Sequence, residues 1–244
     1  MQGSGRRRLY LMRHGHVDYF APGLEDPRLA VLTDEGRRQA QAARDALRQI
    51  RFDLALSSGL RRTRETAEIV LAAHGPEVVL EEEPGFEELK SGFLKAQSRE
   101  ELAARLAFGF DDADRPGAKF LPDGETFAAA EARIVAALQK MLLGRAWRQA
   151  LLVAHEGVNR IILGWACQGG LASIGAFEQD LGCINVVDID VAPDAAGRRL
   201  EVLRAIIKSM NVTPYDYVKE GLARTSLEHL FGIDFGASRP ARPA

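Results

Sequence analysis

Short apolar runs alternate with amphipathic stretches along most of the chain. Strands are predicted where apolar residues run together or alternate, at 9–12, 52–56, 78–80, 151–154, 184–191 and 200–207. Helices are predicted where apolar residues recur every three or four positions, over 34–50, 60–71, 124–142 and 158–166. Strands that alternate with helices in this way are typical of an α/β protein with a mostly parallel sheet.

The first predicted strand ends in Arg13-His14-Gly15. Arginine carries a permanent charge on a planar fork suited to phosphate, and a neutral histidine can act as a nucleophile near pH 7. The glycine lets the backbone turn sharply and lets a ligand approach it closely. Open α/β sheets bind ligands at the carboxyl ends of their strands, so this turn is a candidate anion site. The motif is short, and a turn with an exposed histidine is the alternative.

A second strand ends in the same way. The apolar run 151–154 leads directly into His155-Glu156-Gly157 and then into an apolar helix. Because the carboxyl ends of parallel strands meet at one edge of a sheet, we expect His14 and His155 to lie close together.

Three arginines, Arg61, Arg62 and Arg64, fall in the first turn of the helix predicted over 60–71. Cations at a helix N-terminus oppose the helix dipole and repel one another, so this cluster is unfavourable unless an anion lies among them. A solvated arginine cluster on the surface is the alternative. We expect at least one of the three side chains to face inward.

Composition narrows the class of protein. The 244 residues suit one large α/β domain, and a net charge of −2 argues against nucleic acid as the main partner. No apolar run approaches the roughly 20 residues of a membrane span, and residues 1–8 lack the apolar segment of a secretion signal. Cys167 and Cys183 lie in apolar surroundings without a CxxC spacing, so we expect reduced core thiols. A cytoplasmic protein fits these features.

Several segments lack regular periodicity. Residues 92–123 contain glycines, prolines and an acidic cluster, which favours a lid or substrate loop, with an ordinary surface excursion as the alternative. Residues 193–197 are typical of a hairpin connection, and we expect short helices within 212–235. Residues 1–8 and 236–244 are expected to be disordered.

Five segments resemble, in the same order, the motifs of the histidine phosphatase superfamily, and in particular its phosphoglycerate-mutase-like branch. They are 11–15 (LMRHG), 32–36 (LTDEG), 58–67 (SGLRRTRETA), 122–126 (PDGET) and 153–157 (VAHEG). Five motifs in sequence are far more specific than any one of them. The resemblance implies a single domain over 1–244 with a three-layer α/β/α sandwich fold around a mostly parallel central sheet.

The resemblance also implies an activity and assigns residues to it. It implies a reaction through a phosphohistidine, which we expect to be hydrolysis of small phosphorylated metabolites without a cofactor or a metal. We expect no nucleic-acid or membrane partner, and a homodimer is left open. His14 matches the nucleophile of the family, and Arg13, Arg62 and His155 match the groups that hold the phosphate. The attacking nitrogen of His14 must be unprotonated, so we expect a backbone carbonyl near Gly15 to hold the proton on the other nitrogen.

A further segment of the chain resembles the one that carries the general acid of the family. The segment 86–92 (FEELKSG) resembles the one that carries the acid, and the spacing to Gly92 selects Glu88 rather than Glu87. The residues after the acid depart from the usual pattern of the family, as does Gly59, which stands where Asp is usual. Burial beside a bound phosphate favours the protonated form of Glu88, provided that the arginines point at the phosphate.

Three alternatives to a phosphatase are weighed. A cofactor-dependent phosphoglycerate-type mutase is the nearest, but residues 16–20 (HVDYF) replace the run found in such mutases, which favours water as the acceptor. His14, His16 and Asp18 have the H-x-H-x-D spacing of a metal-dependent hydrolase, although the chain has only five histidines. A non-enzymatic phosphoester-binding protein is the third alternative, and such proteins typically lose the nucleophile.

Overall fold

The computed structural model describes residues 4–90, 108–232 and 234. The strands are β1 (Gly5–Arg13), β2 (Leu54–Ser57), β3 (Leu80–Glu82), β4 (Gln149–Ala154), β5 (Ile184–Pro193) and β6 (Leu200–Val212). They form a six-stranded sheet in the order β3-β2-β4-β1-β5-β6. β3, β2, β4 and β1 are parallel to one another, whereas β5 is antiparallel to both β1 and β6. The mostly parallel sheet and the hairpin predicted from the sequence are confirmed.

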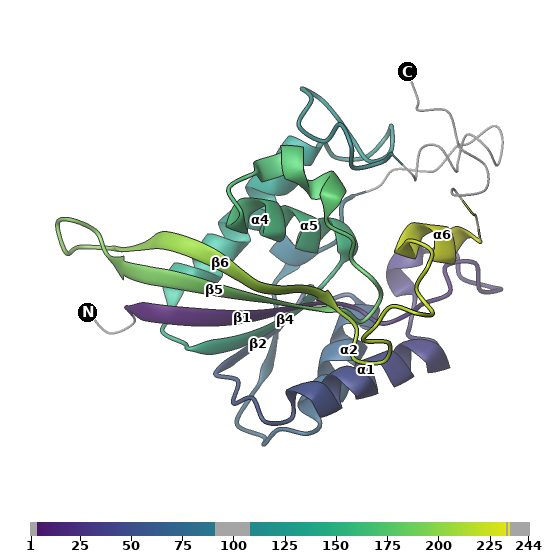
Figure 1. Cartoon of the computed structure of the whole chain (residues 1–244), viewed down its shortest axis with the longest axis horizontal. Coiled ribbons are helices and arrows are strands. Elements are labelled where there is room, and N and C mark those ends of the chain that lie inside the picture. Colours follow the sequence, from purple (N-terminus) through teal and green to yellow (C-terminus); the bar gives the residue numbers. More distant parts are fainter. Residues whose placement is uncertain (1–3, 91–107, 233, 235–244) are drawn as a thin grey trace.

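Helices cover both faces of this sheet. The helices are α1 (Asp34–Leu47), α2 (Arg61–Leu71), α4 (Phe127–Gly144), α5 (Glu156–Ala166) and α6 (Ser226–Phe231). The 3-10 turns are η1 (Pro27–Leu29), η2 (Pro84–Phe86) and η3 (Gly170–Ala176). α1 and α2 lie on one face and α4 and α5 on the other (Figure 1), which confirms the three-layer α/β/α sandwich.

Alternation of side chains along the central strands explains the two helical layers. In β1, Leu9 and Leu11 pack into the core shared with α4 and α5, whereas Tyr10 and Met12 pack into the core shared with α1 and α2. Since successive side chains point to opposite faces of a strand, a continuous apolar run must be covered on both faces. The apolar stripes of the helices supply that cover.

Two of the predicted helices begin at a threonine. The Thr33 hydroxyl accepts the N–H of Gly36 at 3.2 Å and caps α1. The Thr126 hydroxyl accepts the N–H of Ala129 at 3.1 Å and caps α4. Each such cap satisfies a backbone donor that the helix leaves unpaired and contributes about 1 kcal/mol. These threonines therefore set where α1 and α4 begin.

The structure differs from the sequence prediction in two outer parts of the sheet. The prediction that residues 1–8 are disordered is wrong for residues 5–8, which form the first half of β1. Pairing with β5 and an ion pair of 2.6 Å between Arg8 and Asp188 hold these residues in place. Because the partners are distant in the sequence, no local sequence pattern indicates this strand segment. The strand predicted at 78–80 begins two residues later in the structure, as β3. This edge strand pairs with β2 alone, and its position is set by that pairing rather than by a run of apolar residues.

The cysteines occupy different environments. Both are free, but the prediction that both are core thiols is wrong for Cys167, which is exposed. Cys167 ends α5, where the chain leaves the core. Cys183 is buried, and burial raises the pKa of its thiol to about 12, so this thiol stays protonated and unreactive.

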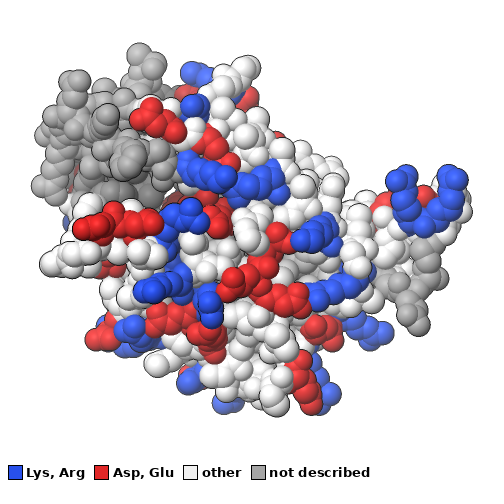
Figure 2. All heavy atoms as spheres, turned by 180° about the vertical axis from the view of Figure 1, so that it is seen from behind, with Lys and Arg blue, Asp and Glu red and all other residues white. Residues whose placement is uncertain are grey.

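Some predictions fall outside the described residues. The predicted lid or substrate loop lies outside them up to residue 107, and so does the tail at 236–244 that was predicted to be disordered. The remainder of the predicted loop, from 108 to 123, forms turns and bends. No helix in the described ranges is long and apolar enough to cross a membrane. On the face shown in Figure 2, basic and acidic side chains are interspersed.

Candidate active site

Two histidines meet at the carboxyl edge of the sheet. β1 and β4 are parallel neighbours, and Arg13 pairs with Ala154 where both strands end. His14 and His155 directly follow these residues, and their ring centroids lie 5.3 Å apart in a T-shaped arrangement. Both are buried, with 2% and 0% of their surface exposed. The predicted juxtaposition of the two histidines is confirmed.

Helix α1 holds the turn that follows β1. A Cβ atom on Gly15 would lie 2.5 Å from the carbonyl oxygen of Gly36, and one on Gly36 would lie 2.2 Å from the carbonyl oxygen of His16. Only glycine fits at such distances, which explains why both motifs carry one. The side-chain oxygen of Gln39 accepts the N–H of His16 at 2.8 Å. α1 thus fixes the backbone on which His14 stands.

The His14 ring uses one nitrogen within the protein. Its Nδ1 lies 2.8 Å from the carbonyl oxygen of Gly15 and donates to it, as expected, which leaves a lone pair on Nε2. Burial, together with the charges of Arg62 and Arg13, lowers the pKa of His14 well below its usual value. The ring is therefore neutral at pH 7, as a nucleophile requires.

His155 is anchored by the turn that leads into α2. Its Nε2 lies 2.8 Å from the hydroxyl of Ser58, which in turn lies 2.9 Å from the hydroxyl of Thr63. Burial and the nearby charge of Arg62 lower the pKa of His155 well below its usual value. Nδ1 is left buried without a protein partner among the described residues.

Arg13 is fixed by a buried carboxylate. Its guanidinium lies 3.0 Å from Glu156, the first residue of α5, and donates to the backbone carbonyl of Gln179. Glu156 also accepts from Arg160 at 2.8 Å and from the hydroxyl of Ser226 on α6 at 3.1 Å. Burial opposes ionisation of Glu156, but the two arginines and these hydrogen bonds lower its pKa overall. An ionised carboxylate therefore orients Arg13.

Arg62 is the inward-facing arginine predicted at the start of α2. Only 5% of its surface is exposed, whereas Arg64 lies at the surface and pairs with Glu82 at 3.2 Å. The Arg62 guanidinium donates to the carbonyl of Pro27 at 3.2 Å and lies over the ring of Tyr19, 5.7 Å from its centroid. These contacts hold the guanidinium with a neutral acceptor and an aromatic face, so its positive charge remains available to a ligand.

Three buried nitrogen atoms near His14 have no hydrogen-bond partner in the described ranges: Nε of Arg13, Nε of Arg62 and Nδ1 of His155. A buried polar atom without a partner costs about 1–3 kcal/mol, and native proteins rarely leave several together. Both arginines act electrostatically on His14, and the His155 ring contacts it. The oxygen atoms of an anion such as phosphate are suitable partners for donors of this kind.

Glu88 lies against the loop that carries His155. Its carboxylate accepts the N–H of Leu89 at 2.9 Å and the N–H of Gly157 at 3.4 Å. Gly157 permits this approach, because a Cβ atom there would lie 2.8 Å from a Glu88 oxygen. Burial raises the pKa of Glu88, and the negative charge of Glu156 adds to this increase. The raised pKa favours the protonated form that a general acid needs.

The neighbouring Glu87 faces a different environment. Its carboxylate pairs at 3.0 Å with Arg28, whose side chain is largely exposed. The structure therefore brings Glu88, rather than Glu87, to the loop of His155.

Two supporting residues of the pocket, Glu156 and Ser58, were not predicted from the sequence. Glu156 and Arg160 are four residues apart on α5, a spacing that predicts a helical ion pair and was a usable signal for Glu156. Ser58 follows Ser57 directly, and no feature of the sequence indicates which of the two serines contacts His155.

The structure does not assemble the H-x-H-x-D cluster into a set of metal ligands. Among the described residues, the group of three whose ligand atoms lie close together contains His16 but neither His14 nor Asp18. The Asp18 carboxylate instead accepts the N–H of Phe20 at 2.8 Å.

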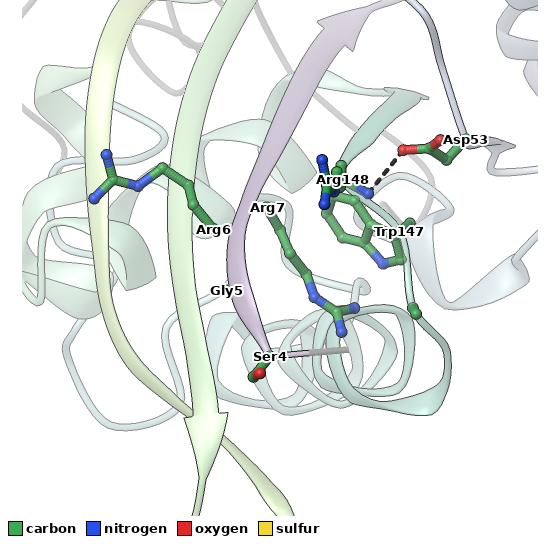
Figure 3. A pocket seen from close by; sticks show the side chains of 8 residues that line it. Ser4, Gly5, Arg6, Arg7, Asp53, Trp147 and Arg148 are labelled. Atoms are coloured by element: carbon green, nitrogen blue, oxygen red, sulfur yellow. Dashed lines mark hydrogen bonds between the residues drawn. The ribbon is translucent and has the colours of Figure 1, made fainter. Parts of the chain in front are cut away.

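A separate hollow lies at the other end of the sheet, where the parallel strands begin. Figure 3 shows its lining by side chains that include Arg6, Arg7, Trp147 and Arg148. The Asp53 carboxylate accepts the backbone N–H of Arg148 at 2.8 Å at its edge. This hollow is remote from the carboxyl edge and shares no residue with the histidine pocket.

The fold and the pocket define an α/β protein with two histidines and two arginines arranged for an anion at the carboxyl edge of its sheet. A model of the histidine phosphatase superfamily (branch 1) matches residues 9–195, a range that includes His14, Arg62, Glu88 and His155. The chain therefore belongs to the histidine phosphatase superfamily.

Named relatives include both phosphatases and mutases. The chain is 28% identical over 185 residues to the adenosylcobalamin/alpha-ribazole phosphatase of Salmonella typhimurium, covering 75% of this chain and 90% of the relative. It is 28% identical over 155 residues to a probable phosphoglycerate mutase of Enterobacter sp., covering 60% of this chain and 68% of the relative. The crystal structure of a putative alpha-ribazole-5'-P phosphatase from Escherichia coli superposes with a TM-score of 0.66 at 24% identity, covering 85% of this chain and 97% of that one. This likeness supports the fold.

The close approach of Gly36 to the His16 backbone predicts the effect of a single added methyl group. Gly36→Ala should lower the free energy of unfolding by about 1–3 kcal/mol, because its Cβ atom meets rigid backbone at 2.2 Å. Gly144→Ala, at the end of α4, is the matched control, since no atom lies within 4 Å of its added Cβ. Urea unfolding of the two variants measures the difference, and equal free energies of unfolding would contradict the argument.

Proposed function

We propose that this protein hydrolyses small phosphomonoesters through a phosphohistidine on His14. The observation that carries the proposal is a neutral, oriented imidazole on which Arg13, Arg62 and His155 act, each with a buried nitrogen atom that has no partner among the described residues. Phosphoryl transfer needs positioning and charge neutralisation more than covalent chemistry from the protein, and two arginines supply both without a metal ion. The phosphatase relative named above supports hydrolysis.

The proposed reaction has two steps. The lone pair on Nε2 of His14 attacks phosphorus, the bond between phosphorus and the ester oxygen breaks, and Glu88 gives its proton to the leaving alkoxide. In the second step the Glu88 carboxylate takes a proton from water, the water oxygen attacks the phosphohistidine, and the bond to Nε2 breaks to release inorganic phosphate. The charge of a bound phosphate also favours a proton on Nδ1 of His155, which then donates to a phosphate oxygen.

Removal of the nucleophile tests the intermediate. His14→Ala should lower kcat/KM by at least about a thousandfold and abolish labelling by a phosphodonor. In the unaltered protein, the label should survive a quench in base and be lost in acid, as expected for phosphohistidine. His74→Ala, which removes a histidine outside the pocket, is the control and should keep label and turnover. Full activity in His14→Ala would refute the mechanism.

The role of Glu88 is tested by the choice of leaving group. Glu88→Gln should slow hydrolysis of an alkyl phosphate by about a hundredfold or more, because an alkoxide needs a proton to leave. The loss should be smaller for p-nitrophenyl phosphate, whose leaving group needs less protonation. Glu87→Gln is the matched control, since that carboxylate pairs with Arg28. A larger effect of Glu87→Gln would move the general acid by one residue.

The acceptor of the phosphoryl group separates a phosphatase from a mutase. We expect phosphate release from a panel of phosphomonoesters that includes α-ribazole 5′-phosphate, unaffected by a metal chelator. Interconversion of 2- and 3-phosphoglycerate should be slow with or without 2,3-bisphosphoglycerate, because residues 16–20 lack the mutase pattern that shields the phosphohistidine from water. Mutase turnover ten times faster than phosphate release would instead assign the chain to the mutases.

A further inference from the structure

A second group of potential ligands lies beside the Arg-His-Gly turn. His16, Glu35 and His229 each offer a ligand atom, and these three atoms lie within 4.8 Å of one another. Nε2 of His229 lies 4.0 Å from a Glu35 oxygen, and the two imidazole rings pack edge to face with centroids 5.8 Å apart. The three residues come from the turn after β1, from the first turn of α1 and from α6.

The hydrogen bonds around His16 fix which of its nitrogen atoms is free. The Thr33 hydroxyl donates to the His16 carbonyl at 3.3 Å and accepts the N–H of Gly36 at 3.2 Å. Its oxygen therefore accepts Nδ1–H of His16, which lies 2.9 Å away, and the lone pair remains on Nε2. Metal-binding histidines are oriented in this way by a hydrogen bond to their other nitrogen.

We propose that His16, Glu35 and His229 form a binding site for a Zn²⁺-like divalent metal ion that fastens α6 to the Arg-His-Gly turn. Two imidazoles and one carboxylate, with water in the fourth position, are a common set of zinc ligands. Ligand atoms of a tetrahedral zinc site lie roughly 3.3 Å apart. The three ligand atoms here lie within 4.8 Å of one another, so the largest separation must shrink by up to about 1.5 Å. The side chains of Glu35 and His229 are about half exposed, at 46% and 53%. The Glu35 oxygen nearest to His229 accepts a long hydrogen bond of 3.3 Å from the Gln39 amide, which it would exchange for the ion.

The site would add a second anchor for α6. The first anchor is Ser226, whose hydroxyl donates to Glu156 behind Arg13 and whose N–H donates to Glu178 at 3.0 Å. The metal ion would connect the same short helix to His16, two residues after His14. Binding would therefore hold α6 against the edge of the pocket. This inference concerns metal binding alone and does not depend on the proposed phosphatase function.

Zinc binding to the full chain, measured by competition with a fluorescent chelator in phosphate-free buffer, tests the proposal. The unaltered protein should bind Zn²⁺ at this site, and His229→Ala and Glu35→Gln should each weaken binding by at least about a hundredfold. Glu35→Gln keeps the shape of the side chain and removes its charge. His74→Ala, a histidine in another part of the fold, should bind within about twofold of the unaltered protein.

Hydrogen exchange supplies an independent readout. Zn²⁺ should slow exchange of the amides of 225–232 by about tenfold or more in the unaltered protein and have no effect on them in His229→Ala. Failure of the unaltered protein to bind Zn²⁺ would overturn the proposal. Unchanged binding in both His229→Ala and Glu35→Gln, with loss in His14→Ala, would overturn it as well and assign the ion to the histidine pocket.

Discussion

The ion pair between Arg13 and Glu156 is the interaction on which the pocket depends. Taking a guanidinium and a carboxylate out of water costs several kcal/mol for each charge, and the pair is stable only when further hydrogen bonds satisfy both groups. Here Glu156 accepts from Arg160 and Ser226, and Arg13 donates to the carbonyl of Gln179. The cation therefore lies at the end of β1 in one orientation, and its Nε has no partner within the part of the chain that the structure describes. A solvated arginine would have to lose its side-chain freedom whenever a ligand bound.

The second arginine gives the pocket its charge. Arg13 pairs with the carboxylate of Glu156, whereas the Arg62 guanidinium donates to a neutral carbonyl, and Arg62 acts more strongly than Arg13 on both histidines. Together with burial, this charge lowers the pKa of both His14 and His155. The protein thus keeps a neutral nucleophile next to a site that favours anions. A protonated His14 could not attack phosphorus, because its Nε2 would have no lone pair.

Prediction from the sequence succeeded where the signal is local. The strand that ends in Arg13-His14 and the one that ends in Ala154-His155 are each marked by an apolar run, and parallel pairing brings their ends together. The prediction failed where the interacting residues are distant in the sequence. Residues 5–8 looked like a disordered basic tail because their acidic partners lie on β5. The sequence places Thr33 just before the predicted helix over 34–50, but the hydrogen bond between Thr33 and His16 depends on tertiary contact.

The support of the pocket extends beyond the part of the chain that the family shares. The match to the histidine phosphatase superfamily ends at residue 195, yet Ser226 on α6 donates to Glu156 and so contacts the group that orients Arg13. Figure 1 places α6 beside the edge where β1 and β4 end. A segment outside the shared core can vary without disturbing the motifs, and here it reaches the carboxylate that pairs with Arg13. We therefore expect the C-terminal segment to be the source of differences between this chain and its relatives in how rigidly Arg13 is held.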